Sequence, residues 1–142
     1  MKKAFGLVGF TGTRNGLSME QRMLLNLLLQ AATSFIHGDC IGADAEAHSI
    51  AMSLKLEVLK RPSYLDNQRA FTEGGQIIAD PERPLVRNKR IVEQCDVLLA
   101  CPCGPEKLRS GTWSTVRYAR NVGRDGLVIM PDGTMQPIGE KR

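Results

Sequence analysis

The chain has 142 residues, about the length of one domain, which is enough to bury a substantial apolar core. Apolar residues make up 42% of it and charged residues 24%, a composition that excludes a disordered, collagen-like or coiled-coil protein. The formal net charge of +4 is compatible with an anionic ligand or with nucleic acid and does not choose between them. We therefore expect a single domain spanning residues 1–142.

No apolar run approaches the roughly 20 residues that a membrane-spanning helix requires. Two lysines precede an apolar run at the N-terminus, as in a secretory signal, but this run ends in TGTR rather than at a small-residue cleavage site. The four cysteines show neither zinc-finger spacing nor a C-x-x-C pair; they are Cys40, Cys95, Cys101 and Cys103. We expect a cytoplasmic protein with reduced thiols, no metal site and no membrane contact.

Five short apolar runs, which predict β-strands, alternate with helical patterns along the chain. The strands are expected at 4–10, 33–37, 56–60, 96–101 and 127–130. The helices are expected at 18–32, 43–54, 85–94 and 111–122. Residues 61–84 lack a clear period and are rich in proline and glycine, which is typical of a long functional segment.

The first expected helix has a recognisable start and an apolar pattern. Ser18 and Gln21 have the spacing of a capping box. Apolar residues then recur at i, i+4 spacing, as in a helix; they are Met23, Leu24, Leu27, Leu28 and Ala31.

Nearly continuous apolar strands that are separated by helices indicate a parallel sheet covered on both faces. We predict an α/β protein, a Rossmann-like three-layer α/β/α sandwich with about five mostly parallel strands. Ligands bind such sheets beyond the carboxyl ends of the strands, near the point where the strand order reverses. The loops that matter are therefore those at 12–16, 38–42, after residue 60, and 102–112.

The first of these loops follows the first strand and reads TGTR. It is not the G-x-G-x-x-G dinucleotide fingerprint, so a nicotinamide enzyme is not expected and no cofactor is implied. Gly12, Thr13 and Arg14 either present amides and a hydroxyl to a phosphate or form a tight turn, and the sequence leaves both open.

The second loop lies in the segment HGDCIGADAEAH. Gly38 and Gly42 flank the predicted start of a helix, where amides and the helix dipole favour an anion, so both are candidate ligand contacts. Asp39 could accept a hydrogen bond from a ribose hydroxyl. Asp44 is either a further ligand contact or a first-turn acid that favours the dipole. His48, four residues later, is expected to be solvated or paired with Asp44.

Two later helix starts carry further candidates. Arg87 and Asn88 lie in the basic segment RPLVRNKR, where an arginine fork suits bidentate phosphate binding, although such clusters are usually solvated. The strongest phosphate candidate is the start of the last helix, at Ser110, Gly111 and Thr112. Gly111 permits close approach, Thr112 and Ser114 supply hydroxyls, and the N–H groups of a new helix are free there. Trp113 either stacks on a ligand base or fills the junction between loop and helix.

Five segments, taken in order, resemble the SLOG superfamily, which includes DNA-processing protein A (Smf) and the LOG phosphoribohydrolases of cytokinin nucleotides. They are FTGTR at 10–14, HGDCIGADAEAH at 37–48, PLVRN at 84–88, CDVLLA at 95–100 and SGTWSTVRYAR at 110–120. The resemblance covers nearly the whole chain and is greatest to small stand-alone members. It implies a Rossmann-like fold, a homodimer and a nucleotide-derived ligand, with phosphate at Gly111 and Thr112 and ribose near Gly38 and Asp39.

The match to the LOG enzymes is incomplete at the residue that does the chemistry. Their motif is P-G-G-x-G-T-x-x-E, and its glutamate assists cleavage of the N-glycosidic bond together with an upstream arginine. Here Gly111, Thr112 and Arg87 match, but Thr115 stands at the glutamate position. The acid/base group on which hydrolysis by this mechanism depends is therefore missing at that position. The candidate catalytic residues that remain are Asp39, Asp44 and Arg87.

The leading hypothesis is a protein that senses or sequesters a nucleotide derivative with a ribose-phosphate group, or hydrolyses it at the glycosidic bond. The alternative is a single-stranded DNA-binding module like DNA-processing protein A, with the basic segments 83–90 and 107–124 along the backbone. Few aromatic residues (4 Phe, 2 Tyr, 1 Trp) are present to stack on bases, which argues against it. A third hypothesis is a vestigial pocket in a protein that acts through a partner surface.

Overall fold

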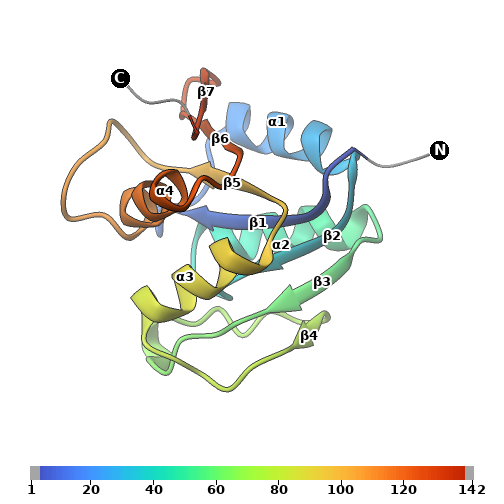
Figure 1. Ribbon diagram of the computed structural model, residues 1–142. Coiled ribbons are helices and arrows are strands. Elements are labelled where there is room, and N and C mark those ends of the chain that lie inside the picture. The colour runs from blue at the N-terminus through green and yellow to red at the C-terminus, as the bar shows by residue number, and fades with distance from the viewer. Residues whose placement is uncertain (1–3, 140–142) are drawn as a thin grey trace.

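The computed structural model describes residues 4–139, so both ends of the expected 1–142 domain lie outside it. Seven strands form one sheet in the order β4-β3-β2-β1-β5-β6-β7 (Figure 1). They are β1 (Gly6–Gly12), β2 (Ala32–His37), β3 (Glu57–Lys60), β4 (Gln76–Ile77), β5 (Val97–Cys101), β6 (Gly126–Ile129) and β7 (Met135–Pro137). Every neighbouring pair is parallel except β6 and β7.

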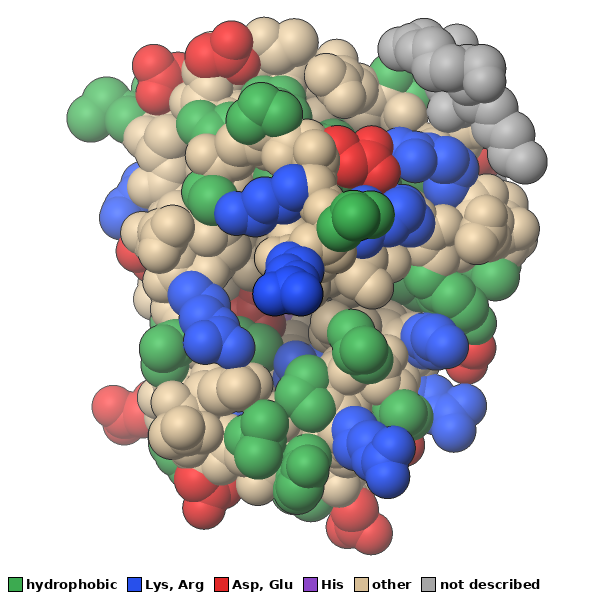
Figure 2. All heavy atoms as spheres, turned by 90° about the vertical axis from the view of Figure 1, so that its left-hand side faces the viewer, with side chains coloured by type: hydrophobic (Ala, Val, Ile, Leu, Met, Phe, Trp, Pro, Cys, Tyr) green, Lys and Arg blue, Asp and Glu red, His purple; other side chains and the backbone are tan. Residues whose placement is uncertain are grey.

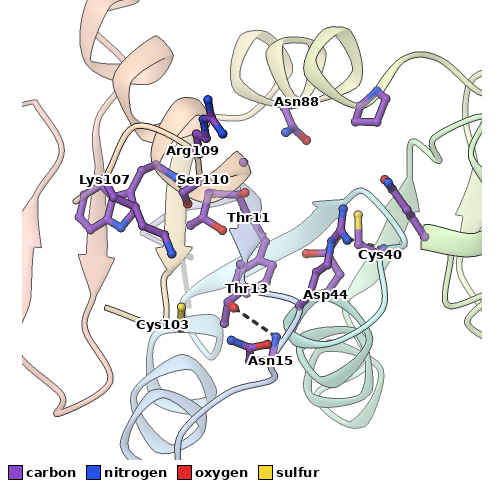
Figure 3. Close-up of a pocket in the computed structure, with 18 of the residues that line it drawn as sticks. Thr11, Thr13, Asn15, Cys40, Asp44, Asn88, Cys103, Lys107, Arg109 and Ser110 are labelled. Carbon is purple, nitrogen blue, oxygen red and sulfur yellow. Dashed lines mark hydrogen bonds between the residues drawn. The ribbon is translucent and has the colours of Figure 1, made fainter. Parts of the chain in front are cut away.

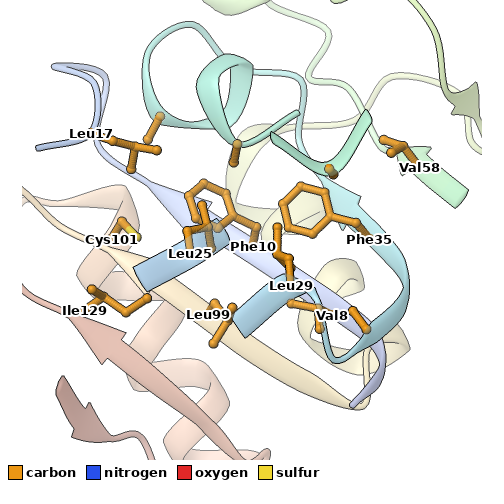
Figure 4. Close-up of a cluster of buried hydrophobic side chains, with 14 residues drawn as sticks. Val8, Phe10, Leu17, Leu25, Leu29, Phe35, Val58, Leu99, Cys101 and Ile129 are labelled. Carbon is orange, nitrogen blue, oxygen red and sulfur yellow. The ribbon is translucent and has the colours of Figure 1, made fainter. Parts of the chain in front are cut away.

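Helices cover both faces of the sheet, which confirms the predicted α/β/α layers. They are α1 (Met19–Leu29), α2 (Ala43–Ser53), α3 (Pro84–Gln94) and α4 (Gly111–Val122), with one 3-10 turn, η1 (Asp66–Gln68). Side chains of α1 and α2 pack with Phe10 and Phe35 in one core cluster (Figure 4). Those of α3 and α4, among them Ile91 and Val116, form a second cluster on the opposite face. In the described part of the chain, no helix is long and apolar enough to cross a membrane.

The sheet has more strands than the expected number of about five. All five expected strands are present, and the two additional ones lie at the two edges of the sheet. The strand β4 has two residues and β7 has three, and all of them are exposed to solvent. Strands so short carry no period in hydrophobicity, so sequence patterning could not reveal them.

The start of α1 confirms the capping box, and the structure identifies the buried face of this helix. Ser18 Oγ accepts the amide of Gln21 at 3.0 Å, and Gln21 Oε1 accepts the amide of Ser18 at 2.9 Å. Leu25 and Leu29 are fully buried, and Leu24 and Leu28 are partly buried against the same core cluster. Met23 and Leu27 are 66% and 62% exposed. The apolar run from 23 to 29 is so continuous that its spacing does not identify the buried face.

The strand order brings two distant loops together. From β1 the chain proceeds outward through β2, β3 and β4, and α3 then returns it to the other side of β1, where β5 pairs in parallel. The order therefore reverses between β1 and β5, where a ligand site is expected. The amide of Thr13, just after β1, donates to the carbonyl of Cys101 at the end of β5, at 3.1 Å.

Candidate functional site

A cavity of about 600 Å³ opens at this reversal point (Figure 3). It is large enough for a nucleotide-sized ligand, since small-molecule sites generally have volumes of about 300–1,000 Å³. All but three of the predicted ligand contacts line it: Gly12, Thr13, Arg14, Asp44, Arg87, Asn88, Ser110, Gly111, Thr112 and Trp113. The exceptions are Gly38, Asp39 and Gly42. The topology thus gathers four of the predicted loops or helix starts around one space.

The N-terminus of α4 faces the cavity with two unoccupied amides. Ser110 caps the helix, because its Oγ accepts the amide of Trp113 at 3.1 Å and its carbonyl accepts the amide of Ser114 at 2.8 Å. The amides of Gly111 and Thr112 have no acceptor among residues 4–139. A Cβ on Gly111 would meet no heavy atom within 4 Å, so this helix end is open to a ligand. Free amides and the helix dipole together favour an anion there.

Three cationic side chains line the cavity without an acidic partner. Lys107 and Arg109 come from the loop between β5 and α4, and Arg14 comes from the loop after β1. Within the described residues, none of the three has a carboxylate within 4.0 Å. Figure 2 shows blue Lys and Arg side chains around a hollow on the face that carries this loop. The excess positive charge favours an anionic ligand.

Arg87 lines the cavity, but it is largely engaged within the protein. Its Nη1 donates to the carbonyls of Gly38 and Arg61 at 2.6 and 3.1 Å, and its Nε donates to Asn88 Oδ1 at 2.7 Å. Its Nη2 lies 3.3 Å from the sulfur of Cys40. A guanidinium has five N–H groups, so one remains for a ligand and the expected bidentate fork is not available. Arg87 therefore holds α3 to the neighbouring loops and adds positive charge to the cavity wall.

Gly38 and Gly42 have structural reasons to be glycine. A Cβ on Gly38 would lie 2.5 Å from Nη1 of Arg87, so the buried guanidinium fits only against a glycine. Gly42 has a φ of +89°, and its Cβ would lie 2.3 Å from the carbonyl oxygen of Arg14. Neither residue lines the cavity, so the ligand contacts predicted for them are not found in this geometry.

Asp39 also lies outside the cavity, and its carboxylate is fully buried. One oxygen accepts from Arg69 Nη2 at 2.9 Å, and the other accepts the amide and the hydroxyl of Thr72 at 3.0 and 2.6 Å. Burial alone would raise its pKa, but the hydrogen bonds from Thr72 and Arg69 keep the pKa below its usual value. Asp39 therefore fastens the segment after β3 to the β2 loop, and the predicted ribose contact is not found there.

Asp44 is the one carboxylate that lines the cavity among the described residues. Its Oδ2 accepts the amides of Gly38 and Cys40 at 3.0 and 3.2 Å. Burial raises the pKa of Asp44 to about 6, despite the opposing effects of Arg87 and the two amides. The pairing of Asp44 with His48, one of the alternatives left open by the sequence, is not found. Of the two candidate acids, Asp39 and Asp44, only Asp44 lines the cavity and could contact a ligand.

His48 is buried rather than solvated, and it belongs to a directed chain of hydrogen bonds. His37 Nδ1 accepts the amide of Asp39 at 2.9 Å, so the proton of its neutral ring is on Nε2, which lies 2.9 Å from His48 Nδ1. His48 Nε2 in turn donates to the carbonyl of Glu73 at 2.7 Å. Burial and the neighbouring His48 lower the pKa of His37 to about 3. These histidines bind the segment after β3 to the sheet and do not face the cavity.

That segment, residues 61–83, is more ordered than expected. It contains η1 and β4, and it is held at several points by Asp39, by His48 and by Lys60, whose Nζ donates to the carbonyl of Thr72 at 2.8 Å. Gln68 of η1 lines the cavity. The segment therefore forms part of the wall of the site.

Trp113 and Thr115 are both buried in α4. The indole of Trp113 is 3% exposed, its Nε1 donates to the carbonyl of Gly104 at 3.1 Å, and it packs in the second core cluster. This geometry supports the junction-filling interpretation over stacking on a base. Thr115, at the position of the LOG glutamate, donates its hydroxyl to the carbonyl of Gly111 at 2.8 Å.

Several residues that line the cavity have no clear functional signature in the sequence. Lys107 and Arg109 lay within a segment recognised only as basic, and their place directly before the SGT helix start was the usable signal. Cys40 and Cys103 had no pattern that pointed to a ligand. Burial raises the pKa of Cys40 to about 12, so its thiol is not a ready nucleophile. Among the described residues no group of metal-ligating side chains was found.

No protein-family profile and no curated protein sequence matches the chain. Solved structures do match it. The molybdenum cofactor binding protein from Rippkaea orientalis is 17% identical with a TM-score of 0.68, over 89% of this chain and 77% of that one. DNA processing protein A from Streptococcus pneumoniae is 19% identical with a TM-score of 0.62, over 87% of this chain and 50% of that one. The structural-genomics target TM1055 is 16% identical with a TM-score of 0.60, over 89% and 72%.

These likenesses agree with the sequence resemblance at the level of the fold. The neighbours include DNA processing protein A, which the resemblance named, and they match nearly nine-tenths of the chain. The chain therefore has a Rossmann-like α/β/α fold, which it shares with these solved structures.

Proposed function

We propose that this protein binds a nucleotide-derived ligand through its phosphate, with the phosphate at the N-terminus of α4. The observation that carries the proposal is the pair of unoccupied amides of Gly111 and Thr112 beside cations without acidic partners. An anion there would receive two backbone hydrogen bonds and the attraction of Lys107, Arg109 and Arg14. The cavity volume leaves room for a sugar and a base beyond the phosphate.

The structural neighbours support a ligand of this general kind. One is described as a molybdenum cofactor binding protein and another as a DNA processing protein. Binding, rather than hydrolysis of the LOG type, is the function we propose, because Thr115 supplies no carboxylate and its hydroxyl is bonded to the helix backbone. Should hydrolysis occur, Asp44 is the acid that we would assign to it, since Asp39 is withdrawn from the cavity.

Calorimetric titration with nucleoside 5′-monophosphates and ADP-ribose tests this proposal, and chromatography of the same mixtures detects any released base. We expect saturable binding of at least one nucleotide with one site per chain. Absence of heat and of base release with every compound would contradict the proposal.

Binding of single-stranded DNA is the second candidate, favoured by the unpaired cations and by the likeness to DNA processing protein A. The two aromatic side chains that line the cavity, Phe10 and Trp113, are 1% and 3% exposed, so they offer little surface for stacking. The salt dependence of binding separates the two functions. Affinity for an oligonucleotide falls steeply with salt in proportion to the number of phosphate contacts, whereas a single bound phosphate gives a shallow slope.

A homodimer, which the sequence resemblance implies, is retained as a proposal. The exposed apolar side chains Met19, Met23 and Leu27 lie on one face of α1 and would suit burial in such a contact. Sedimentation equilibrium tests it: a monomer at all concentrations up to about 100 µM, well above a micromolar dissociation constant, would contradict it.

A further inference from the structure

The two sides of the cavity have opposite character. In Figure 3, Lys107, Arg109 and Ser110 lie on one side, and Asp44 lies across the cavity from them. The first side is cationic and has free amides. The second has the buried carboxylate of Asp44, 5% exposed, which lies within 4.0 Å of no Lys or Arg nitrogen in the described chain. Arg87 also lines the cavity and lowers the pKa of Asp44, but its guanidinium is largely engaged by hydrogen bonds within the protein.

On the side of Asp44, the backbone amides that could bind a second anion already donate hydrogen bonds within the protein. Asp44 Oδ2 occupies the amides of Gly38 and Cys40, and the amide of Ala43 at the start of α2 donates to the carbonyl of Thr13 at 2.9 Å. These donors would otherwise be available to an anion, as they are at α4. The carboxylate of Asp44 thus provides the negative charge at the start of α2, whereas the amides at the start of α4 remain available to a ligand.

The second oxygen of Asp44 remains available to a ligand. Both amides donate to Oδ2, so Oδ1 is the oxygen left to accept a hydrogen bond from a ligand in the cavity. A carboxylate oxygen in such a place accepts hydrogen bonds and repels anions. A sugar hydroxyl satisfies it, whereas a phosphate brings like charge to a buried acid.

We infer that Asp44 makes the site selective for a nucleotide whose sugar carries free hydroxyl groups, and that it excludes one with a second phosphate on that sugar. This inference rests on the proposed phosphate site at α4. It identifies the ligand class as nucleotides that are phosphorylated at one end only, and it makes Asp44 the residue that distinguishes them from 2′- or 3′-phosphorylated ones.

The test starts from the 5′-monophosphate that the wild-type protein binds most tightly. Its 2′-deoxy and 3′-deoxy analogues and its 2′,5′- and 3′,5′-bisphosphates are then titrated under the same conditions. We expect at least one deoxy analogue and both bisphosphates to bind about 10-fold or more weakly, as is typical of a lost or reversed interaction with a charged group.

The variant Asp44→Asn assigns this selectivity to one side chain. Its amide oxygen still accepts the amides of Gly38 and Cys40, while its NH₂ group turns a donor toward the cavity. The penalty for the bisphosphates should therefore shrink to about 3-fold or less, well below a charged-group interaction. Asp66→Asn is the matched control, because it removes the same charge from an exposed residue outside the cavity, and it should retain the wild-type ranking.

The outcomes separate the two proposals. If no 5′-monophosphate binds the wild-type protein, the phosphate site itself is wrong. If one binds but the bisphosphates bind equally well, or if Asp44→Asn leaves their penalty unchanged, the role of Asp44 is wrong and the phosphate site stands. Should Asp44→Asn fail to fold, Asp44→Ser replaces it as the variant without the carboxylate. The affinities of the wild-type protein for the monophosphate and the bisphosphates still test whether the site rejects a second phosphate.

Discussion

The carboxylate of Glu106 lies 3.1 Å from Nη1 of Arg117, and neither residue lines the cavity. Glu106 is the one acid of the loop at 102–110, and Arg120 also lies 3.7 Å from it. Glu106 is therefore held outside the cavity by two arginines of α4, whereas Lys107 and Arg109 of the same loop line the cavity. The positive character of the site therefore depends on residues that would not touch the ligand.

Arg117 is the residue through which α4 positions this loop. It donates to the carbonyls of Lys107 and Leu108 at 3.3 and 3.2 Å. We predict that Arg117→Met weakens nucleotide binding by about 3- to 10-fold, because the loop must then be ordered on binding at roughly 0.5–1.5 kcal/mol. The measurement is calorimetry, with Arg22→Met, a remote arginine paired with Glu46, as control. Equal affinity of Arg117→Met and wild type would exclude this positioning role.

Gly111 allows the anion site to be tested without disturbing the fold. A side chain there meets open space, and an acid in the first turn of a helix is favourable by about 0.3–1 kcal/mol. We predict that Gly111→Asp unfolds at or above the wild-type temperature but loses nucleotide binding, because its carboxylate repels the phosphate. Gly111→Ala, the matched control, should stay folded and keep measurable binding. Undiminished binding by Gly111→Asp would mean that the phosphate lies elsewhere.

Gly38 tests how firmly Arg87 is held. A methyl group at Gly38 would lie 2.5 Å from Nη1 of a guanidinium with four hydrogen-bonded contacts, so neither group can yield freely. We predict that Gly38→Ala lowers the free energy of unfolding by about 1–3 kcal/mol, as for overpacking. Gly104→Ala, where a Cβ meets no atom within 4 Å, should change it little. Urea unfolding compares the two, and equal stabilities would show that Arg87 relocates without loss.

Stability in acid should depend on His37. Its pKa in the folded chain is about 3 and its ordinary value is 6.5, so between these values the unfolded chain binds more protons than the folded one. Its contribution to stability is therefore present above pH 6.5 and is lost as the pH falls, by about 1.4 kcal/mol per pH unit. Asp44, with its pKa raised to about 6, acts in the opposite sense between pH 6 and 3.8.

The variant His37→Asn isolates the histidine, because Asp44 is present in both proteins and an asparagine oxygen can still accept the amide of Asp39. We predict that the stability of wild type relative to His37→Asn declines by on the order of 1 kcal/mol per pH unit from pH 6.5 to 4.5. Urea unfolding at three pH values in this range measures it. Parallel pH curves would mean that His37 is not held neutral.

The sequence revealed the layers of the fold and most of the cavity because both follow from local patterns. The apolar runs marked the five longer strands, and glycine with hydroxyl residues at 110–112 marked the helix start that faces the cavity. The role of Asp39 could not be foreseen, because its partners Arg69 and Thr72 lie 30 and 33 residues away in a segment without periodicity. Only tertiary structure distinguishes a carboxylate tied to such a segment from one that meets a ligand.

The most direct test of the proposed phosphate site is a ¹⁵N–¹H NMR titration of the wild-type chain with its best-binding nucleoside 5′-monophosphate. The amide resonances of Gly111 and Thr112 should shift saturably, with the same dissociation constant as calorimetry gives, because these N–H groups donate to the phosphate. Saturable shifts confined to other parts of the chain, with Gly111 and Thr112 unchanged, would contradict the account.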